Sequence, residues 1–217
     1  MSDTVNEAVQ RLNSQLPLKD RQDRLSEPLK ALHREVIKSL VMRGRPPTRP
    51  EVAALVGEGE VDAAIARLGK DDLIVLSKDQ REIVGAYPVT AESTPHEVHV
   101  SGQTIHAMCA LDALSVSPMY DVPVEICSRC RVSGDAVCIK QEGMRIMEAT
   151  PPSVRVGVRW QMPTGNHAAH SMCMEMVFLK DDATAAAWHG GDLDHHSVFT
   201  LDEAIQFGAR FFKPLLS

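Results

Sequence analysis

Cysteine is the residue type in this chain with the most chemistry to offer, and one cysteine stands close to a carboxylic acid. Cys109 and Asp112 lie three residues apart in the segment HAMCALDAL. Residues three apart share one face of a helix, so the thiol and the carboxyl would point the same way near the helix start, where the helix dipole lowers the pKa of a thiol. The spacing predicts a nucleophile beside a proton donor; a buried cysteine beside a solvated aspartate is the alternative interpretation.

A second candidate thiol, Cys173, stands among methionines in a segment, residues 172–179, that we predict to be a strand. If Cys173 faced Cys109, two thiolates could form the near-linear, two-coordinate site that only very soft metal ions favour. Taken alone, Cys173 is also typical of a core cysteine, and alternate methionines are more often packing than ligands.

The other three cysteines form a cluster in the sequence. Cys127 and Cys130 make a C-x-x-C on a predicted hairpin, and Cys138 lies on the returning strand. The pattern resembles half of a zinc ribbon, for which His106 or His170 could supply the fourth ligand. Reduced thiols that receive or hold a soft metal are at least as well supported as a structural zinc. The paired histidines fit no metal motif and are predicted to be loop residues: His167, His170, His195 and His196.

Helices dominate the first ninety residues. Apolar residues recur at three- and four-residue spacing through residues 29–40, and Gly44 with the Pro46-Pro47 pair ends that helix. Thr48 and Glu51 form a capping box at the start of a second helix, Arg49–Val56. A third helix at residues 61–68 and two short strands at 73–76 and 82–84 complete a winged-helix pattern.

Beyond a joint at residues 90–95 the periodicity changes to two-residue alternation, which predicts a sheet. A short apolar helix at residues 108–116 is predicted to end before Pro118, and two helices at 184–189 and Leu201–Phe212 finish the chain. The fold class is therefore α+β. We predict a helical extension (1–24), a winged-helix-like domain (25–90) and a catalytic domain (91–217) with a mixed or antiparallel sheet and flanking helices. The alternating apolar positions are Val98 and Val100; Val122, Val124 and Ile126; and Val154, Val156, Val158 and Trp160.

Composition narrows the class of protein. With 217 residues, 44% hydrophobic and 24% charged, the chain can bury a core and is neither disordered nor a membrane protein. No apolar run approaches the ~20 residues of a spanning helix, and the N-terminus is polar where a signal peptide is apolar, so we expect a cytoplasmic protein. The chain has five cysteines, and in a cytoplasmic protein this odd number argues against a disulfide framework.

The net charge of −6 arises entirely after residue 90, because residues 1–90 hold equal numbers of basic and acidic side chains. Neither part offers the basic surface typical of nucleic-acid binding. A metal-responsive, thiol-rich regulator with a winged-helix DNA-binding part is nevertheless the alternative function. Its third helix would offer only Arg67 against Glu60 and Asp62, although Arg43, Arg45 and Arg49 form a small basic run that could touch phosphate.

Taken in order, the motifs resemble the organomercurial (alkylmercury) lyase family of bacterial mercury resistance, over roughly residues 25–215. The resemblance rests on the Cys109–Asp112 segment, on SRCRVSG at residues 128–134, on Ser171-Met-Cys173 before a strand that contains Phe178, and on Ala187-Trp188. The family is known to carry a winged-helix-like N-terminal part, which agrees with the pattern of the first ninety residues.

The resemblance implies protonolysis of a carbon–mercury bond, a detoxification reaction. Cys109 and Cys173 match the family's two mercury-binding cysteines, and Asp112 matches the acidic residue that handles the proton. Cys130 matches a family cysteine regarded as structural, whereas Cys127 and Cys138 look additional. The products would be a hydrocarbon and Hg(II) bound by two thiolates, to be passed to low-molecular-weight thiols or a mercuric reductase, with no cofactor required and no nucleic acid or membrane involved.

Overall fold

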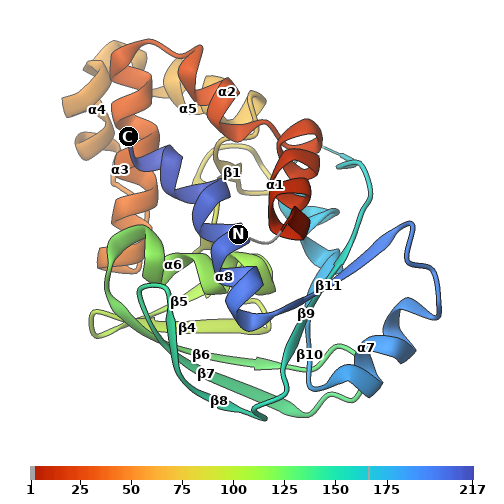
Figure 1. Ribbon diagram of the computed structural model, residues 1–217. Helices are drawn as coiled ribbons and strands as arrows, with labels where there is room; N and C mark the ends of the chain where they lie inside the picture. Colours follow the sequence, from red (N-terminus) through yellow and green to blue (C-terminus); the bar gives the residue numbers. More distant parts are fainter. Residues whose placement is uncertain (1–2, 166) are drawn as a thin grey trace.

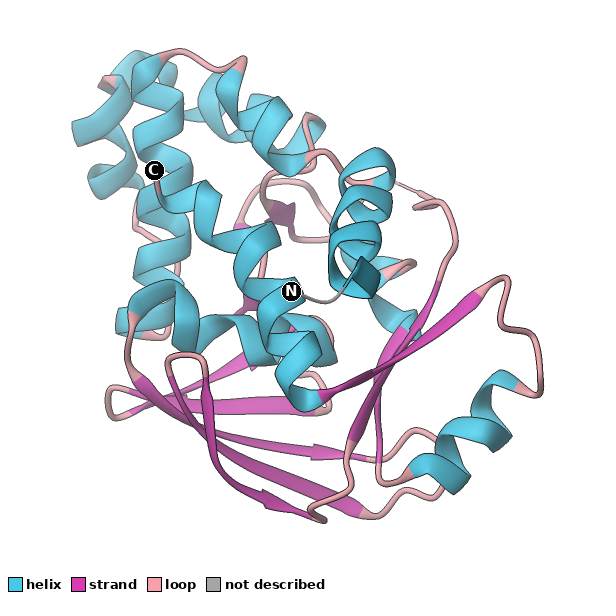
Figure 2. Cartoon of the chain, in the orientation of Figure 1, coloured by secondary structure: helices cyan, strands magenta, loops and turns pink. Residues whose placement is uncertain are grey.

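The computed structural model describes residues 3–165 and 167–217 and has the expected α+β architecture (Figures 1 and 2). The α-helices are α1 (Asp3–Gln15), α2 (Leu18–Asp23), α3 (Glu27–Arg43), α4 (Arg49–Val56), α5 (Val61–Lys70), α6 (Ala110–Tyr120), α7 (Asp182–His189) and α8 (Leu201–Phe212). The strands are β1 (Val75–Leu76), β2 (Ile83–Ala86), β3 (Val89–Thr90), β4 (His96–Val100), β5 (Gln103–Ala107), β6 (Pro123–Arg129), β7 (Ala136–Glu142), β8 (Arg145–Thr150), β9 (Arg155–Arg159), β10 (Met176–Leu179) and β11 (His196–Thr200). Short 3₁₀ turns are η1 (Glu58–Glu60), η2 (Ala168–His170), η3 (Cys173–Glu175) and η4 (Lys213–Leu216).

Two antiparallel sheets make up the β structure. The larger has the order β1-β2-β3-β5-β4-β6-β7-β8, and the smaller has the order β10-β9-β11. Helix α6 packs against β4, β5, β6 and β7 and is itself covered by α8 (Figure 1). In β6 and β7 burial alternates residue by residue, as expected for strands that have one face on the core and the other in solvent. None of the described helices is long and apolar enough to cross a membrane.

The predicted elements of the winged-helix pattern are all present. Helix α3 ends at Gly44, whose φ of 65° lies in the left-handed region that glycine adopts without strain. Thr48 and Glu51 form the capping box at the start of α4, with Pro50 in the first turn. Helix α5 and the strands β1 and β2 follow, so local sequence signals determine this part of the fold.

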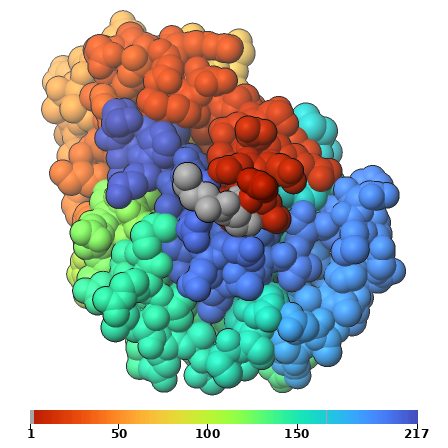
Figure 3. Space-filling model, in the orientation of Figure 1, coloured from red at the N-terminus to blue at the C-terminus, as the bar shows by residue number. Residues whose placement is uncertain are grey.

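The N-terminal elements pack closely onto the rest of the molecule. Strand β3 joins the β1-β2 hairpin to β5, so the sheet runs without a break past residue 90. Helix α8 packs on both α1 and α6, and in Figure 3 the C-terminal segment (blue) lies between the N-terminal helices (red) and the strands around residue 150. One hydrophobic core draws residues from both parts. The domain boundaries 1–24, 25–90 and 91–217 stay predictions.

Helix α6 was predicted to end before Pro118, but it continues to Tyr120 and contains that proline. A proline lacks the N–H that would bond to the carbonyl four residues earlier, which here belongs to Leu114. The side-chain amide of Gln141, on β7, donates a hydrogen bond of 2.9 Å to that carbonyl instead. A contact from a distant strand therefore allows the helix to include its proline.

The prediction of a strand over residues 172–179 is wrong in its first half. Met172 precedes the 3₁₀ turn η3, and only Met176–Leu179 forms a strand, β10. Strand β5, which pairs with β4 across a turn at Ser101 and Gly102, was not predicted. Both turn residues have positive φ, 50° and 78°, as the tight turn of a two-residue hairpin requires, and Ser-Gly was the available signal.

Candidate active site

Three side chains from two distant parts of the chain converge in the interior of the molecule. Cys109 follows β5, Asp112 lies in the first turn of α6, and Cys173 begins η3. The two Sγ atoms and a carboxylate oxygen of Asp112 all lie within 4.8 Å of one another, and the three residues are the sole group of this kind in the described part of the chain. The structure therefore brings together the two thiols and the carboxyl that the sequence singled out.

Cys109 is the residue that caps helix α6 and is not inside it. Its backbone is extended (φ −154°, ψ 177°), and its Sγ accepts a hydrogen bond from the backbone N–H of Asp112 at 3.3 Å. The thiol thus occupies the position that a serine, threonine or aspartate oxygen usually fills. The sulfur of Met176 lies 3.8 Å from the Cys109 Sγ, so the thiol has soft, polarisable surroundings. The prediction that a shared helical face aligns Cys109 and Asp112 is wrong, because the cap is what holds them together.

The two thiols keep their protons more strongly than their positions in the sequence predict. Cys109 is 0% exposed and Cys173 is 3% exposed. Burial, followed by the nearby Cys173 and Asp112, raises the pKa of Cys109 well above its ordinary value. The contact with Cys109 favours the Cys173 thiolate, but burial and the carboxylates Asp112 and Asp72 outweigh it and raise the pKa of Cys173. The prediction of a lowered pKa for Cys109 is wrong, because burial outweighs the helix dipole.

The carboxyl of Asp112 has a raised pKa and one oxygen without a hydrogen bond among the described residues. Burial raises the pKa of Asp112 to about 7, even though the contacts with the Cys109 thiol and backbone act to lower it. Its Oδ2 atom is buried and has no hydrogen-bond partner among the described residues. Near neutral pH the group is therefore protonated in part of the molecules, and Oδ2 keeps its capacity for a hydrogen bond.

A cavity of about 410 Å³ leads to this group. Cys173 lies in its wall, whereas Cys109 and Asp112 do not border it and lie deeper. A small organic molecule that enters the cavity would reach the Cys173 thiol before the other two groups. The rest of the lining is mainly apolar and includes Met108, Ala169, Val177 and Phe178, together with the polar side chains of His96, His170 and Arg131.

Comparison with known proteins agrees with this geometry. The family model described as MerB, alkylmercury lyase, matches residues 89–213, which is more than half of the chain. The chain belongs to the alkylmercury lyase family. It is 25% identical over 182 residues to the alkylmercury lyase of Streptomyces lividans, covering 82% of this chain and 80% of that one. It is 25% identical over 214 residues to the Bacillus cereus enzyme, covering 96% of this chain and 91% of that one.

A solved structure has the same fold. The crystal structure of the mercury-bound form of MerB2 matches with a TM-score of 0.76 and 23% sequence identity, covering 92% of this chain and 98% of that one. The uncovered 8% of this chain is much shorter than its first ninety residues, so most of the winged-helix-like part has a counterpart in that structure.

In this family member, a buried polar network holds the segment that carries Cys173. The carboxylate of Asp72, from the turn after α5, accepts a hydrogen bond from the Tyr87 hydroxyl at 2.9 Å and lies 3.1 Å from Nδ1 of His167. The same carboxylate accepts the backbone N–H of Ala168 at 3.2 Å, and Tyr87 accepts that of Ala169 at 2.9 Å. The N-terminal part thus fixes the loop that places Cys173.

Sequence reasoning missed Asp72 and Tyr87 and assigned His167 only to a loop. The contacts join residues about ninety positions apart, so no local spacing reveals them. The one available hint was that Tyr87 is the only Tyr, Phe or Trp before residue 91.

The other three cysteines separate into two environments. Cys127 and Cys138 lie opposite each other on β6 and β7, on the solvent side of the sheet. Cys130 is buried beside the cavity, and its Sγ accepts the backbone N–H of Lys180 at 3.4 Å. Residues three apart on an extended chain point to opposite faces, which is why the C-x-x-C does not gather its two thiols. His106 and His170 complete no group of three ligands with these cysteines among the described residues.

Proposed function

We propose that the protein cleaves the carbon–mercury bond of organomercurials by protonolysis, releasing a hydrocarbon and leaving Hg(II) between Cys109 and Cys173. The observation that carries the proposal is the close, buried grouping of two thiols and one carboxyl, within 4.8 Å of one another, in a chain of the alkylmercury lyase family. Soft thiolates are the ligands that mercury prefers, and a carboxylic acid can deliver the proton that the departing carbon needs.

Cys173 engages the substrate first, because its thiol is the one that lines the cavity. Its sulfur displaces the exchangeable ligand of the organomercurial, and the thiol proton leaves with that ligand. The organic group then occupies the apolar cavity, and mercury lies within reach of the deeper Cys109. Two-thiol coordination pushes electron density from sulfur through mercury onto the bound carbon.

Asp112 transfers the proton that completes the reaction. The Asp112 carboxylic acid protonates carbon while the carbon–mercury bond breaks, and the proton that Cys109 gives up as it binds mercury passes to the resulting carboxylate. The bond electrons stay with carbon, so no oxidant or reductant is needed. The sum is one organomercurial and two thiols giving one hydrocarbon, one Hg(II) dithiolate and the protonated displaced ligand. The pKa of about 7 suits Asp112 to both halves of the transfer.

The dithiolate-bound Hg(II) must then leave. Exchange with low-molecular-weight thiols, or with a mercuric reductase, restores the two protonated cysteines for the next cycle. Such thiols are abundant in the cytoplasm, where we place the reaction and its role in mercury detoxification.

The proposal is tested with purified protein, phenylmercury and an excess of a small thiol. Benzene release that depends on Cys109, Asp112 and Cys173 supports the lyase, whereas tight retention of intact phenylmercury contradicts it. A parallel incubation with zinc and with duplex DNA addresses the regulator and zinc-protein alternatives.

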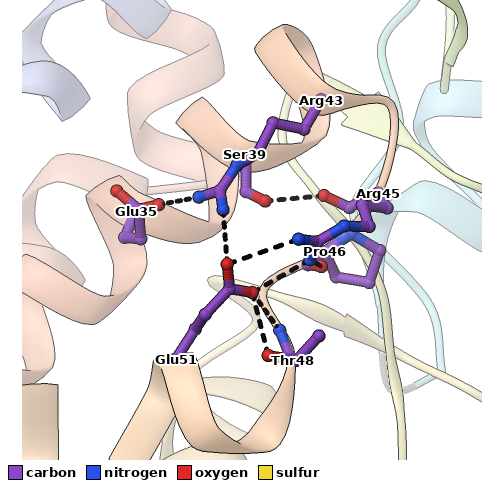
Figure 4. Close-up of polar contacts among 7 residues, drawn as sticks. All are labelled: Glu35, Ser39, Arg43, Arg45, Pro46, Thr48 and Glu51. Atoms are coloured by element: carbon purple, nitrogen blue, oxygen red, sulfur yellow. Dashed lines mark hydrogen bonds and ion pairs between the residues drawn. The ribbon is translucent and has the colours of Figure 1, made fainter. Parts of the chain in front are cut away.

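The arginines of the basic run that could have favoured DNA binding are paired with acidic side chains of this chain. Glu51 accepts hydrogen bonds from Arg43 at 2.6 Å and from Arg45 at 2.9 Å, and Arg43 also pairs with Glu35 (Figure 4). Arg49 pairs with Asp62 of α5 at 2.6 Å. Each guanidinium already has an acidic partner, so this surface offers little net positive charge to a phosphate backbone. We therefore favour the enzyme over the regulator.

A further inference from the structure

Two cysteines outside the candidate active site form a pair on the surface of the sheet. Cys127 of β6 and Cys138 of β7 are directly opposite in the strand register. Cys138 is exposed and Cys127 is partly exposed, whereas their chain neighbours Ile126 and Ile139 are buried in the core. Free cysteine is among the most buried residue types, so two exposed cysteines side by side are unusual for a residue that serves only packing.

The register brings the two side chains close together. The backbone N–H of Cys130 donates to the carbonyl of Asp135 at 2.8 Å, which marks a hydrogen-bonded position just past the end of the β6–β7 ladder and three steps from the Cys127–Cys138 pair. Hydrogen-bonded and non-hydrogen-bonded positions alternate, so the Cys127–Cys138 pair occupies a non-hydrogen-bonded position, where opposite Cα atoms are about 4.5 Å apart and side chains approach most closely. Burial, followed by the neighbouring Cys138 thiol, raises the pKa of Cys127, as two adjacent thiols require.

The number of ligands decides which ions suit this pair. Among the described residues no third cysteine, histidine or carboxylate joins Cys127 and Cys138 in a metal-ligand group. A structural zinc site needs four protein ligands, and calcium or magnesium needs oxygen ligands. Two thiolates alone suit very soft ions that accept near-linear, two-coordinate binding.

The pair also lies next to the cavity of the candidate active site. A shallow depression lined by Cys127 and Cys138 shares Ser93, Thr94 and Arg129 with the wall of that cavity. An ion that leaves the buried site by the cavity mouth therefore passes close to this surface dithiol.

We propose that Cys127 and Cys138 form a second, surface-exposed binding site for a two-coordinate thiophilic metal ion, and that the ion bound there is Hg(II). Binding at this site does not depend on the proposed function; only the source of the ion, the product of carbon–mercury cleavage, rests on it. In a transfer from the buried site, two mercury–sulfur bonds to Cys109 and Cys173 break and two to the surface pair form. The protons of the surface thiols pass to the two thiolates that are released, so no redox partner is needed.

The test uses mercuric chloride alone, so it is independent of lyase activity. The double variant Cys109→Ser/Cys173→Ser is loaded with mercuric chloride, exposed to excess glutathione and desalted, and mercury is measured per chain. We expect about one equivalent to be retained, with the ultraviolet absorption of a mercury–thiolate bond, and we expect both to disappear when Cys127→Ser/Cys138→Ser is added. The matched control adds Cys130→Ser instead, which should leave the retained mercury unchanged.

Two results overturn the proposal. One is a folded Cys109→Ser/Cys173→Ser variant that retains no mercury although Ellman's reagent still titrates accessible thiols. The other is mercury retention that survives the removal of Cys127 and Cys138. Failure of benzene release in the wild-type protein would leave both of these measurements interpretable, so the two proposals fail separately.

Discussion

The chain contains two pairs of thiols in contrasting surroundings. Cys109 and Cys173 come from distant segments, are almost completely buried and share their site with Asp112. Cys127 and Cys138 face each other on neighbouring strands, reach solvent and have no carboxyl in their ligand group. Only the buried pair has what a protonolysis needs, namely thiols that keep their protons and an acid that can pass one on.

Burial accounts for most of this difference. Removing a thiol or a carboxyl from water disfavours its charged form, so the pKa of Cys109, Cys173 and Asp112 all rise. In the proposed reaction these protons are available inside the site and are released when mercury replaces them. A surface dithiol can hold a soft ion but has no protected acid with which to cleave a bond to carbon.

The largest effect is expected from the buried thiols. Cys109→Ser and Cys173→Ser should each reduce benzene release from phenylmercury to the uncatalysed background, because a hydroxyl cannot replace a soft anionic ligand. Cys127→Ser/Cys138→Ser should leave the rate of cleavage close to that of the wild type. Gas chromatography of the headspace measures benzene directly, and near-UV circular dichroism checks the fold. A buried-site variant that retained the wild-type rate would remove the contrast between the two pairs.

Asp112→Asn should separate binding from chemistry. The amide keeps the shape of the side chain but cannot carry the proton, so we expect the rate to fall by about 10²–10⁴-fold, the usual contribution of general acid catalysis. Retention of Hg(II) by Cys109 and Cys173 should persist. Mercury stoichiometry and benzene release are measured on the same sample. Joint loss of both would mean that Asp112 is a ligand and not a proton carrier.

The pH dependence should identify the same carboxyl. The folded pKa of Asp112 is about 7, so the protonated donor is depleted above that pH, and the single-turnover rate should fall by up to about tenfold per unit as pH rises further. The free energy of unfolding should change with pH in the same direction. The raised pKa of Asp112 favours the folded state at low pH, and this contribution is lost as pH rises through about 7. Quenched-flow measurements of the single-turnover rate against pH, with wild type and Asp112→Asn, test this prediction, since the variant should lack the decline in rate.

A smaller effect is expected from the network that holds the Cys173 segment. Asp72→Asn weakens the contacts to Tyr87, His167 and Ala168, which should cost about 1–3 kcal/mol of stability. It should lower the cleavage rate less than Asp112→Asn does. Denaturant unfolding gives the stability, and the labelling rate of Cys173 by iodoacetamide reports its position. Faster labelling is expected in Asp72→Asn than in Tyr87→Phe, which removes the hydroxyl alone; equal labelling in both variants and the wild type would exclude a positioning role.

The parts of the fold that follow local rules were predictable. The capping box at Thr48 and Glu51 and the end of α3 at Gly44 depend on residues within one turn, and they appear as expected. Alternation of apolar residues likewise located β4, β6 and β9. The extension of α6 through Pro118 could not be predicted, because it depends on Gln141 from another strand.

The candidate site, too, was predictable only in those features that depend on nearby residues. The types and order of Cys109, Asp112 and Cys173 indicated the chemistry, but the direction of the thiol pKa depends on burial, which no spacing reveals. The contacts by which Asp72 and Tyr87 hold the Cys173 segment join residues 82 to 96 positions apart, so they left no local signal.

The central claim is that the buried group delivers a solvent-exchangeable proton to carbon while the two thiols take mercury. One measurement tests it directly: a single turnover of phenylmercury by the wild-type protein equilibrated in D₂O, with benzene analysed by mass spectrometry and mercury counted on the protein. The account predicts monodeuterated benzene in equal amount to Hg(II) held by Cys109 and Cys173. Intact phenylmercury on the protein, or benzene without deuterium, would contradict it.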